Sequence, residues 1–193
     1  MEEVTYRRSS QMMPEIQRPV LNCRRPGGVV AALAILLLLS CTRNVYVVRH
    51  AEKATGADQP ANMMTKDPPL SDAGKVRAIV LRDELKRQHI RHIYATPTLR
   101  ATGTAMPLSD ELHIPVDRYQ NVDSLVTMVE KEKGNVLIVG HSNTVDDIVN
   151  GLLHEKKVIG DLKDAEYDNL FLVKLRGHHA RFIRKKYGYP SNP

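Results

Sequence analysis

The sequence predicts an α/β fold, a three-layer α/β/α sandwich with a mostly parallel central sheet. Two observations support this prediction. Short β-branched and aromatic runs alternate with stretches in which apolar residues recur at helical spacing. The run Val136 to Val139 is entirely apolar, which is typical of a strand covered on both faces. Strands and helices in alternation favour helices packed on both sides of a largely parallel sheet.

The expected elements follow one another from residue 44 onward. The expected strands are 44–48, 91–95, 114–117, 136–139, 170–175 and 181–185, and the expected helices are 71–88, 98–111, 123–133 and 143–153. Ser71 can cap the first helix. The inward side of that helix is expected to hold Ala73, Val76, Val80, Leu81 and Leu85. Glycine and three prolines predict a loop over residues 54–69, and Gly177 predicts a turn between the last two strands.

One domain of ordinary size would use most of the 193 residues. We expect it to span residues 44–187, preceded by a largely unstructured segment at 1–43 and followed by a frayed tail at 188–193. Hydrophobic residues at 42% and charged residues at 26% exclude a disordered chain. The formal charge of +6 favours anionic ligands. Nucleic acid is not expected as a partner, because aromatic residues are only 5% of the chain and no predicted helix is basic along one face.

The first 43 residues have the layout of an export signal. Arg24 and Arg25 precede an apolar run from Val29 to Leu39, which is shorter than the roughly 20 residues that cross a bilayer. Residues 38–41, Leu-Leu-Ser-Cys, resemble a bacterial lipobox, which implies cleavage before Cys41 and lipid attachment to its thiol. The protein is then expected outside the cytoplasm, attached to the membrane; the alternative is a cytoplasmic location. The long polar stretch before the signal favours a later start, such as Met13.

Three expected strands end in residues that suit phosphate binding. The endings are Arg49-His50, Thr96 to Arg100 and Gly140-His141. Ligands of open α/β sheets bind beyond the carboxyl ends of the strands, so these endings are expected to share one pocket. Arginine pairs its planar fork with phosphoryl oxygens and stays charged, which makes Arg49 and Arg100 the expected phosphate-binding cations.

Histidine can act as a covalent nucleophile when one ring nitrogen is unprotonated. Neighbouring arginines would help to keep His50 neutral. His141 is expected to donate a hydrogen bond to the phosphoryl oxygens, and Gly140 to let the backbone pass close to the ligand. The helix that begins near Asn143 is expected to add backbone donors to the same pocket.

These motifs resemble those of the histidine phosphatase superfamily, which includes phosphoglycerate mutases and many small phosphatases. Arg49-His50-Ala51 is similar to its opening motif, residues 96–104 to its second motif and residues 140–144 to its late Gly-His motif. Residues 67–71 with Gly74 resemble a helix start of the family, and residues 166–171 a segment of its short bacterial branch. The resemblance spans about residues 44 to 187.

The resemblance implies a phosphoglycerate mutase-like fold and a phosphatase that acts through a phosphohistidine. His50 would carry the phosphoryl group, and the pocket would be completed by Arg49, Arg100 and His141. The substrate-binding motifs contain Thr96, Asn143 and Thr144. Water would then release phosphate. No metal and no organic cofactor is implied, and the expected partner is a small phosphorylated substrate or a phosphoprotein.

Several alternatives stay open at the level of sequence. The proton donor for the leaving group could be Glu52, Asp123 or Glu166. A phosphoglycerate mutase-like phosphoryl transfer and a non-catalytic phosphate-binding lipoprotein compete with the phosphatase. The adjacent His178 and His179 would point to opposite faces of a strand, which disfavours a shared metal. The remaining histidines lack a motif and are expected to be structural or exposed: His89, His92, His113 and His154.

Overall fold

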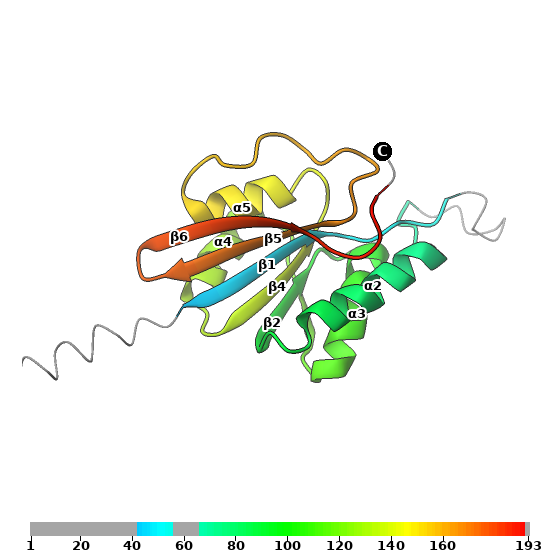
Figure 1. Cartoon of the computed structure of the whole chain (residues 1–193), viewed down its shortest axis with the longest axis horizontal. Coiled ribbons are helices and arrows are strands. Elements are labelled where there is room, and N and C mark those ends of the chain that lie inside the picture. The colour runs from blue at the N-terminus through cyan, green and yellow to red at the C-terminus, as the bar shows by residue number, and fades with distance from the viewer. Residues whose placement is uncertain (1–41, 56–65, 192–193) are drawn as a thin grey trace, which may run out of the picture. The chain divides into compact units, whose positions relative to one another are not determined.

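The computed structural model of the chain describes residues 42–55 and 66–191 (Figure 1). Its strands are β1 (Arg43–Arg49), β2 (Ile90–Ala95), β3 (Val116–Arg118), β4 (Asn135–Gly140), β5 (Asn169–Arg176) and β6 (His179–Lys186). Its described helices are α2 (Asp72–Leu85), α3 (Leu99–Leu112), α4 (Val122–Lys131) and α5 (Val145–Leu153). The predicted signal segment and Cys41 lie outside the described residues. Within the described ranges, no helix has the length and apolar character to cross a membrane.

The six strands form one mixed sheet in the order β3-β2-β4-β1-β5-β6. Four strands are parallel to one another, namely β3, β2, β4 and β1. Strand β5 is antiparallel to both of its neighbours, β1 and β6. The last two strands form a hairpin with Gly177 in its turn, where the backbone takes a positive φ of 56°. Strand β4 lies between β1 and β2, although it follows both of them in the sequence. The carboxyl ends of these three parallel strands therefore border one crevice.

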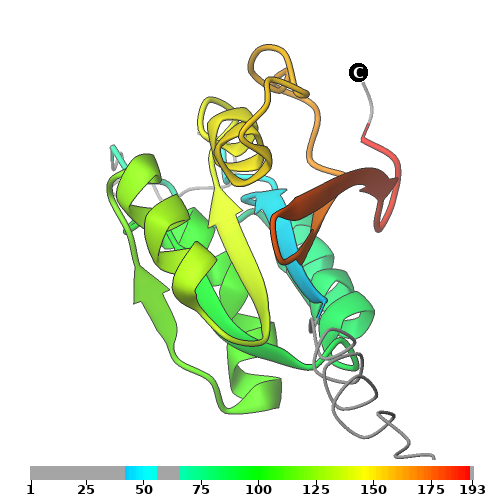
Figure 2. The same cartoon turned by 90° about the vertical axis from the view of Figure 1, so that its left-hand side faces the viewer.

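Two helical layers cover the two faces of the sheet (Figures 1 and 2). Val45 and Val47 of β1 point into a core that is shared with α4 and α5. Tyr46 and Val48 point the other way, into a core shared with α2 and α3. This alternation follows from the pleat of a strand that is buried on both sides. The predicted three-layer α/β/α sandwich is therefore confirmed.

Helix α2 differs from its prediction in the face that it buries. Ser71 caps it as expected, accepting a hydrogen bond from the backbone N–H of Gly74 at 3.1 Å. Leu81 and Leu85 are buried, but Val76 is 48% exposed and Arg77 is buried in its place. The reason is a long-range ion pair, because the Arg77 guanidinium binds both carboxylate oxygens of Glu52.

The described part of the C-terminal tail is hydrogen-bonded, although a frayed end was expected from residue 188. The Tyr189 carbonyl accepts from Arg77 Nη1 at 3.0 Å. Ser191 Oγ accepts from the backbone N–H of Tyr167 at 2.9 Å, and the Ser191 N–H donates to Asp168. The tail is held because it satisfies polar groups that would otherwise lack partners.

Three of the histidines without motifs close helices or turns. His113 and His154 are the C-caps of α3 and α5, and both adopt the left-handed conformation that usually favours glycine or asparagine. His89, between α2 and β2, has the same conformation. Their structural role agrees with the sequence prediction.

Candidate active site

Strand register brings the two histidines of the pocket together. Arg49, the last residue of β1, pairs directly with Gly140, the last residue of β4. The residues that follow them, His50 and His141, therefore leave the sheet side by side. Their ring centroids lie 5.1 Å apart in an edge-on arrangement. The backbone N–H of His50 also donates to the Gly140 carbonyl at 2.9 Å, which fixes the strand end.

The imidazole of His50 is buried, with 4% of the residue exposed, and held in one tautomer. Its Nδ1 lies 2.7 Å from the carbonyl oxygen of Ala51 and can only donate to it. Nε2 therefore keeps its lone pair, and Arg100 Nε donates to it at 3.3 Å. Burial first, and then the charges of His141, Arg49 and Arg100, lower the pKa of His50 to about 3, although the Ala51 hydrogen bond acts in the opposite direction. The ring is neutral at physiological pH.

Arg49 is bound from one side by the loop that precedes β5. Its Nη1 donates to the carbonyl oxygens of Lys163 and Asp164 at 2.8 and 3.1 Å. The Tyr167 ring stacks on the guanidinium, with Cζ 4.3 Å from the ring centroid. Arg49 Nε is buried and has no hydrogen-bond partner in the described part of the chain. An oxyanion in the pocket could satisfy this donor.

Arg100 lies in the first turn of α3 and contacts three pocket residues with three different nitrogens. Besides the Nε contact with His50, its Nη2 lies 3.5 Å from His141 Nδ1. Its Nη1 donates to Asp67 Oδ1 at 2.8 Å. The Nε and Nη2 pair of the fork thus faces the two histidines, the geometry that suits a phosphoryl group between them.

His141 is also neutral and faces a hydroxyl group. Its Nε2 lies 2.9 Å from Thr96 Oγ1, at the end of β2. Burial first, and then the charges of Arg100 and Arg49, lower the pKa of His141 to about 4. The predicted set Arg49, His50, Arg100 and His141 is therefore one contiguous cluster, with Thr96 at its edge. It offers unprotonated ring nitrogens and several fixed donors.

The residues after His141 shape the loop more than they line the pocket. Thr144 Oγ1 accepts from the His141 N–H at 2.9 Å and lies near the carbonyl of the same residue. Asn143 is exposed. Gly140 is needed for space inside the protein and not for ligand approach, because a Cβ there would lie 2.8 Å from Thr144 Oγ1 and 3.0 Å from Tyr119 Oη. Helix α5 begins at Val145, two residues later than expected.

Of the three carboxylates considered as proton donors, two bind other residues and the third is exposed. Glu52 forms the ion pair with Arg77 described above. Glu166 accepts from the backbone N–H of Lys163 and lies 3.5 Å from Arg184. Asp123 is exposed in the first turn of α4. Among the described residues, no hydrogen bond joins any of the three to the four pocket residues.

Two residues of the site were missed by sequence reasoning. Asp67 binds Arg100, and Tyr167 stacks on Arg49 with its ring centroid 6.0 Å from that of His50. Both lie in segments that resemble the family, but neither follows a strand on the pocket side. A search for aromatic or acidic residues in those two segments could have found them.

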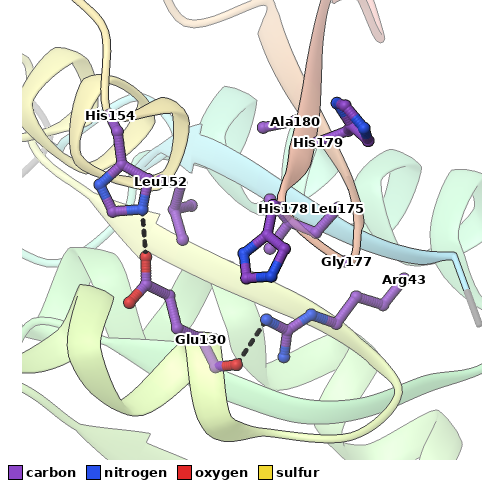
Figure 3. A pocket seen from close by; sticks show the side chains of 9 residues that line it. All are labelled: Arg43, Glu130, Leu152, His154, Leu175, Gly177, His178, His179 and Ala180. Carbon is purple, nitrogen blue, oxygen red and sulfur yellow. Dashed lines mark hydrogen bonds and ion pairs between the residues drawn. The ribbon is translucent and has the colours of Figure 1, made fainter. Parts of the chain in front are cut away.

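A cavity of about 250 Å³ lies at the other end of β1 and is a poorer candidate site (Figure 3). It is lined by Arg43, Glu130 and the histidines 154, 178 and 179. His154 pairs with Glu130 at 2.8 Å, and His178 and His179 point in different directions. Within the described ranges, no cluster of three or more His, Cys, Asp or Glu could hold a metal ion.

Comparisons with known proteins bear on the family and the fold. Residues 45–125 match the family model of the histidine phosphatase superfamily (branch 1). The comparison with curated proteins gave no match.

Solved structures are similar over most of the domain. The protein histidine phosphatase SixA, in complex with tungstate, has a TM-score of 0.57 at 19% identity, covering 74% of this chain and 96% of that one. A mycobacterial glucosyl-3-phosphoglycerate phosphatase has a TM-score of 0.57 at 13% identity, covering 76% of this chain and 99% of that one. At these identities the likeness supports the fold. Together with the family model matched over residues 45–125 and the two histidines and two arginines at adjoining strand and helix ends, it supports an assignment to the histidine phosphatase superfamily.

Proposed function

We propose that this protein is a phosphatase that hydrolyses a phosphate monoester through a phosphohistidine on His50. The observation that carries the proposal is the fixed tautomer of His50. Its Nδ1 is bound to the Ala51 carbonyl at 2.7 Å, so Nε2 presents its lone pair beside the Arg100 guanidinium. A neutral imidazole inside a ring of cationic donors is suited to attack a phosphoryl group.

In the first step, the Nε2 lone pair forms a bond to phosphorus while the bond from phosphorus to the leaving oxygen breaks. The equatorial oxygens gain charge, and Arg100 Nε and Nη2 with Arg49 Nε are the donors available to them. The leaving oxygen takes a proton from solvent, or leaves unprotonated when its own acidity allows. In the second step, water attacks phosphorus, the N–P bond breaks, and Nε2 regains its lone pair as phosphate departs.

The substrate class is open between small phosphate esters and phosphorylated proteins. The similar structures include a protein histidine phosphatase and a glucosyl-3-phosphoglycerate phosphatase, so the fold is compatible with both classes. A phosphoprotein or a small phosphorylated metabolite is therefore the proposed partner. A panel of both types, measured by phosphate release, would assign the class.

Replacing the nucleophile tests the proposal. His50→Ala should lower turnover of p-nitrophenyl phosphate roughly 10⁴-fold or more, because no other group can take the phosphoryl group. A rapid quench with ³²P-labelled substrate should trap label on the wild type that is stable in alkali and labile in acid, and none on His50→Ala. His178→Ala, which changes an exposed histidine at the other end of the sheet, is the matched control.

The outcomes separate the competing functions. Turnover by His50→Ala close to that of the wild type would overturn the assignment of the nucleophile. Phosphate binding by the wild type without turnover of any substrate in the panel would identify a non-catalytic phosphate-binding protein. Isomerisation of a phosphoglycerate in place of phosphate release would identify a mutase.

A further inference from the structure

We propose that Asp67 is a positioning residue of this site, which orients the Arg100 fork toward the two histidines. This inference rests on the proposed function, since it concerns the group that binds the transferred phosphoryl oxygens. Asp67 is not among the residues that the sequence motifs assigned to the pocket. It acts through Arg100 and not on the substrate.

The first support is the geometry of the guanidinium. Arginine has five N–H donors fixed in one plane, so binding one corner sets the direction of the others. Asp67 Oδ1 holds Nη1 at 2.8 Å, the corner away from the pocket contacts. The other two nitrogens then face the histidines: Nε lies 3.3 Å from His50 Nε2, and Nη2 lies 3.5 Å from His141 Nδ1.

The second support is that Asp67 also binds the helix that carries Arg100. Its Oδ2 accepts from the backbone N–H of Leu99, the first residue of α3, at 2.7 Å. One carboxylate therefore joins the side chain of Arg100 to the start of its own helix. A carboxylate is favoured there by the free N–H groups of the first turn.

The third support is how the chain after Asp67 is fastened. Pro68 and Pro69 restrict the backbone directly behind it. The Pro69 carbonyl accepts from the Ala54 N–H at 2.8 Å, and Leu70 forms a bridge with Lys53. These partners lie three and four residues after His50, so the Asp67 carboxylate is placed relative to the nucleophile as well as to α3.

An alternative role for Asp67 is proton donation to the leaving group, since its side chain is 37% exposed. Both of its carboxylate oxygens already accept hydrogen bonds, one from the Arg100 guanidinium and one from the backbone N–H of Leu99. The two roles predict different kinetics. A proton donor matters most for poor leaving groups, whereas the orientation of Arg100 matters equally for all of them.

A double-mutant cycle on Asp67→Ala and Arg100→Ala tests the proposal. With aryl phosphates of graded leaving-group acidity, Asp67→Ala should lower kcat roughly 10- to 100-fold, by the same factor for each substrate, with a smaller change in KM. In the Arg100→Ala background the same change should alter kcat less than about twofold, because the residue that it acts through is gone. Asp67→Asn should recover part of the loss, since its amide oxygen can still accept from Nη1.

A spectroscopic signal makes the test independent of turnover. In folded Asp67→Ala, the ¹⁵N resonance of His50 Nε2 should move in the same direction as in Arg100→Ala, because the Arg100 Nε contact is weakened in both. Asp72→Ala, which removes an exposed aspartate paired with Lys75 on α2, should leave both kcat and the resonance unchanged.

Three results would overturn the proposal. An unchanged kcat in Asp67→Ala would show that Asp67 has no role in turnover. If Asp67→Ala lowers kcat by the same factor in the wild type and in Arg100→Ala, Asp67 acts independently of Arg100. A loss that grows with leaving-group basicity would make Asp67 the proton donor. If the wild type turns over nothing, the proposed function fails, while the His50 resonance still decides whether Asp67 orients Arg100.

Discussion

At the scale of single residues, the proposed nucleophile His50 is kept neutral mainly by burial. His50 and His141 both lose hydration at the end of the sheet, and both lie near two guanidinium groups. The protonated ring would need a partner of opposite charge, and Asp67 is already bound to Arg100. The ring nitrogen that we propose as the nucleophile therefore keeps its lone pair over the whole physiological range of pH.

This neutrality predicts a pH dependence of stability. The pKa of His50 falls from 6.5 to about 3 on folding, so the unfolded chain takes up the proton first as the pH drops. The contribution of His50 to stability is complete above pH 6.5 and is lost progressively between pH 6.5 and about 3. From pH 7.5 to 5.0 the wild type should lose roughly 2 kcal/mol of unfolding free energy through this one group.

Urea unfolding of the wild type and of His50→Gln at pH 7.5 and 5.0 checks the prediction. The loss of unfolding free energy between the two pH values should be smaller in His50→Gln by roughly 2 kcal/mol. His178→Gln, at an exposed position, should keep the loss of the wild type. Equal losses in His50→Gln and the wild type would mean that the ring is protonated in the folded protein.

At the scale of elements, helix α2 is packed against the segment that leaves the nucleophile. The Glu52 carbonyl accepts from the backbone N–H of Ser71 at 2.9 Å and also from its hydroxyl. A Cβ on Gly74 would lie only 2.2 Å from that same carbonyl oxygen. The close approach of helix and loop therefore requires glycine at this position.

Gly74→Ala should destabilise the protein by roughly 2–4 kcal/mol, because backbone and not a flexible side chain stands in the way. Gly103→Ala is the matched control, since it also lies within a helix but would meet only the end of the Leu70 side chain, at 3.3 Å. The gain in helix propensity should keep that variant within about 1 kcal/mol of the wild type. Thermal melts of both variants measure the difference, and similar melting temperatures would contradict the packing described here.

The elements also show which features could be predicted from sequence. The four predicted pocket residues could be proposed from sequence because each ends a buried strand, directly follows one, or lies in the first turn of the helix after one, which is a local pattern. The inward face of α2 was partly wrong, because the burial of Arg77 depends on Glu52, 25 residues away. Asp67 and Tyr167 were missed for a similar reason. Each reaches the site from a loop whose course is set by long-range contacts, and no periodicity records these.

At the scale of the whole domain, the two ends of the sheet differ in character. The pocket lies at the carboxyl end of β1, and Thr42 lies before its amino end. The seven residues of β1 separate them by about 20 Å of extended chain. Thr42 therefore lies far from His50.

This separation gives a prediction for the lipoprotein that the sequence indicates. We propose that Cys41 carries a lipid, and Cys41→Ser should then move the protein from the membrane fraction to the soluble fraction. Its kcat and KM for p-nitrophenyl phosphate should stay within about twofold of the wild type, because the change is remote from the pocket. Fractionation and mass spectrometry of residue 41 decide the matter, and an unmodified thiol in membrane-bound protein would refute it.

The hydrogen bond from the backbone N–H of Tyr167 to Ser191 Oγ has a practical consequence for handling the protein. The Tyr167 ring stacks on Arg49. A peptide label fused directly after the tail is therefore expected to disturb the contact between Tyr167 and Arg49. Such a label should weaken substrate affinity without touching any residue that contacts the substrate.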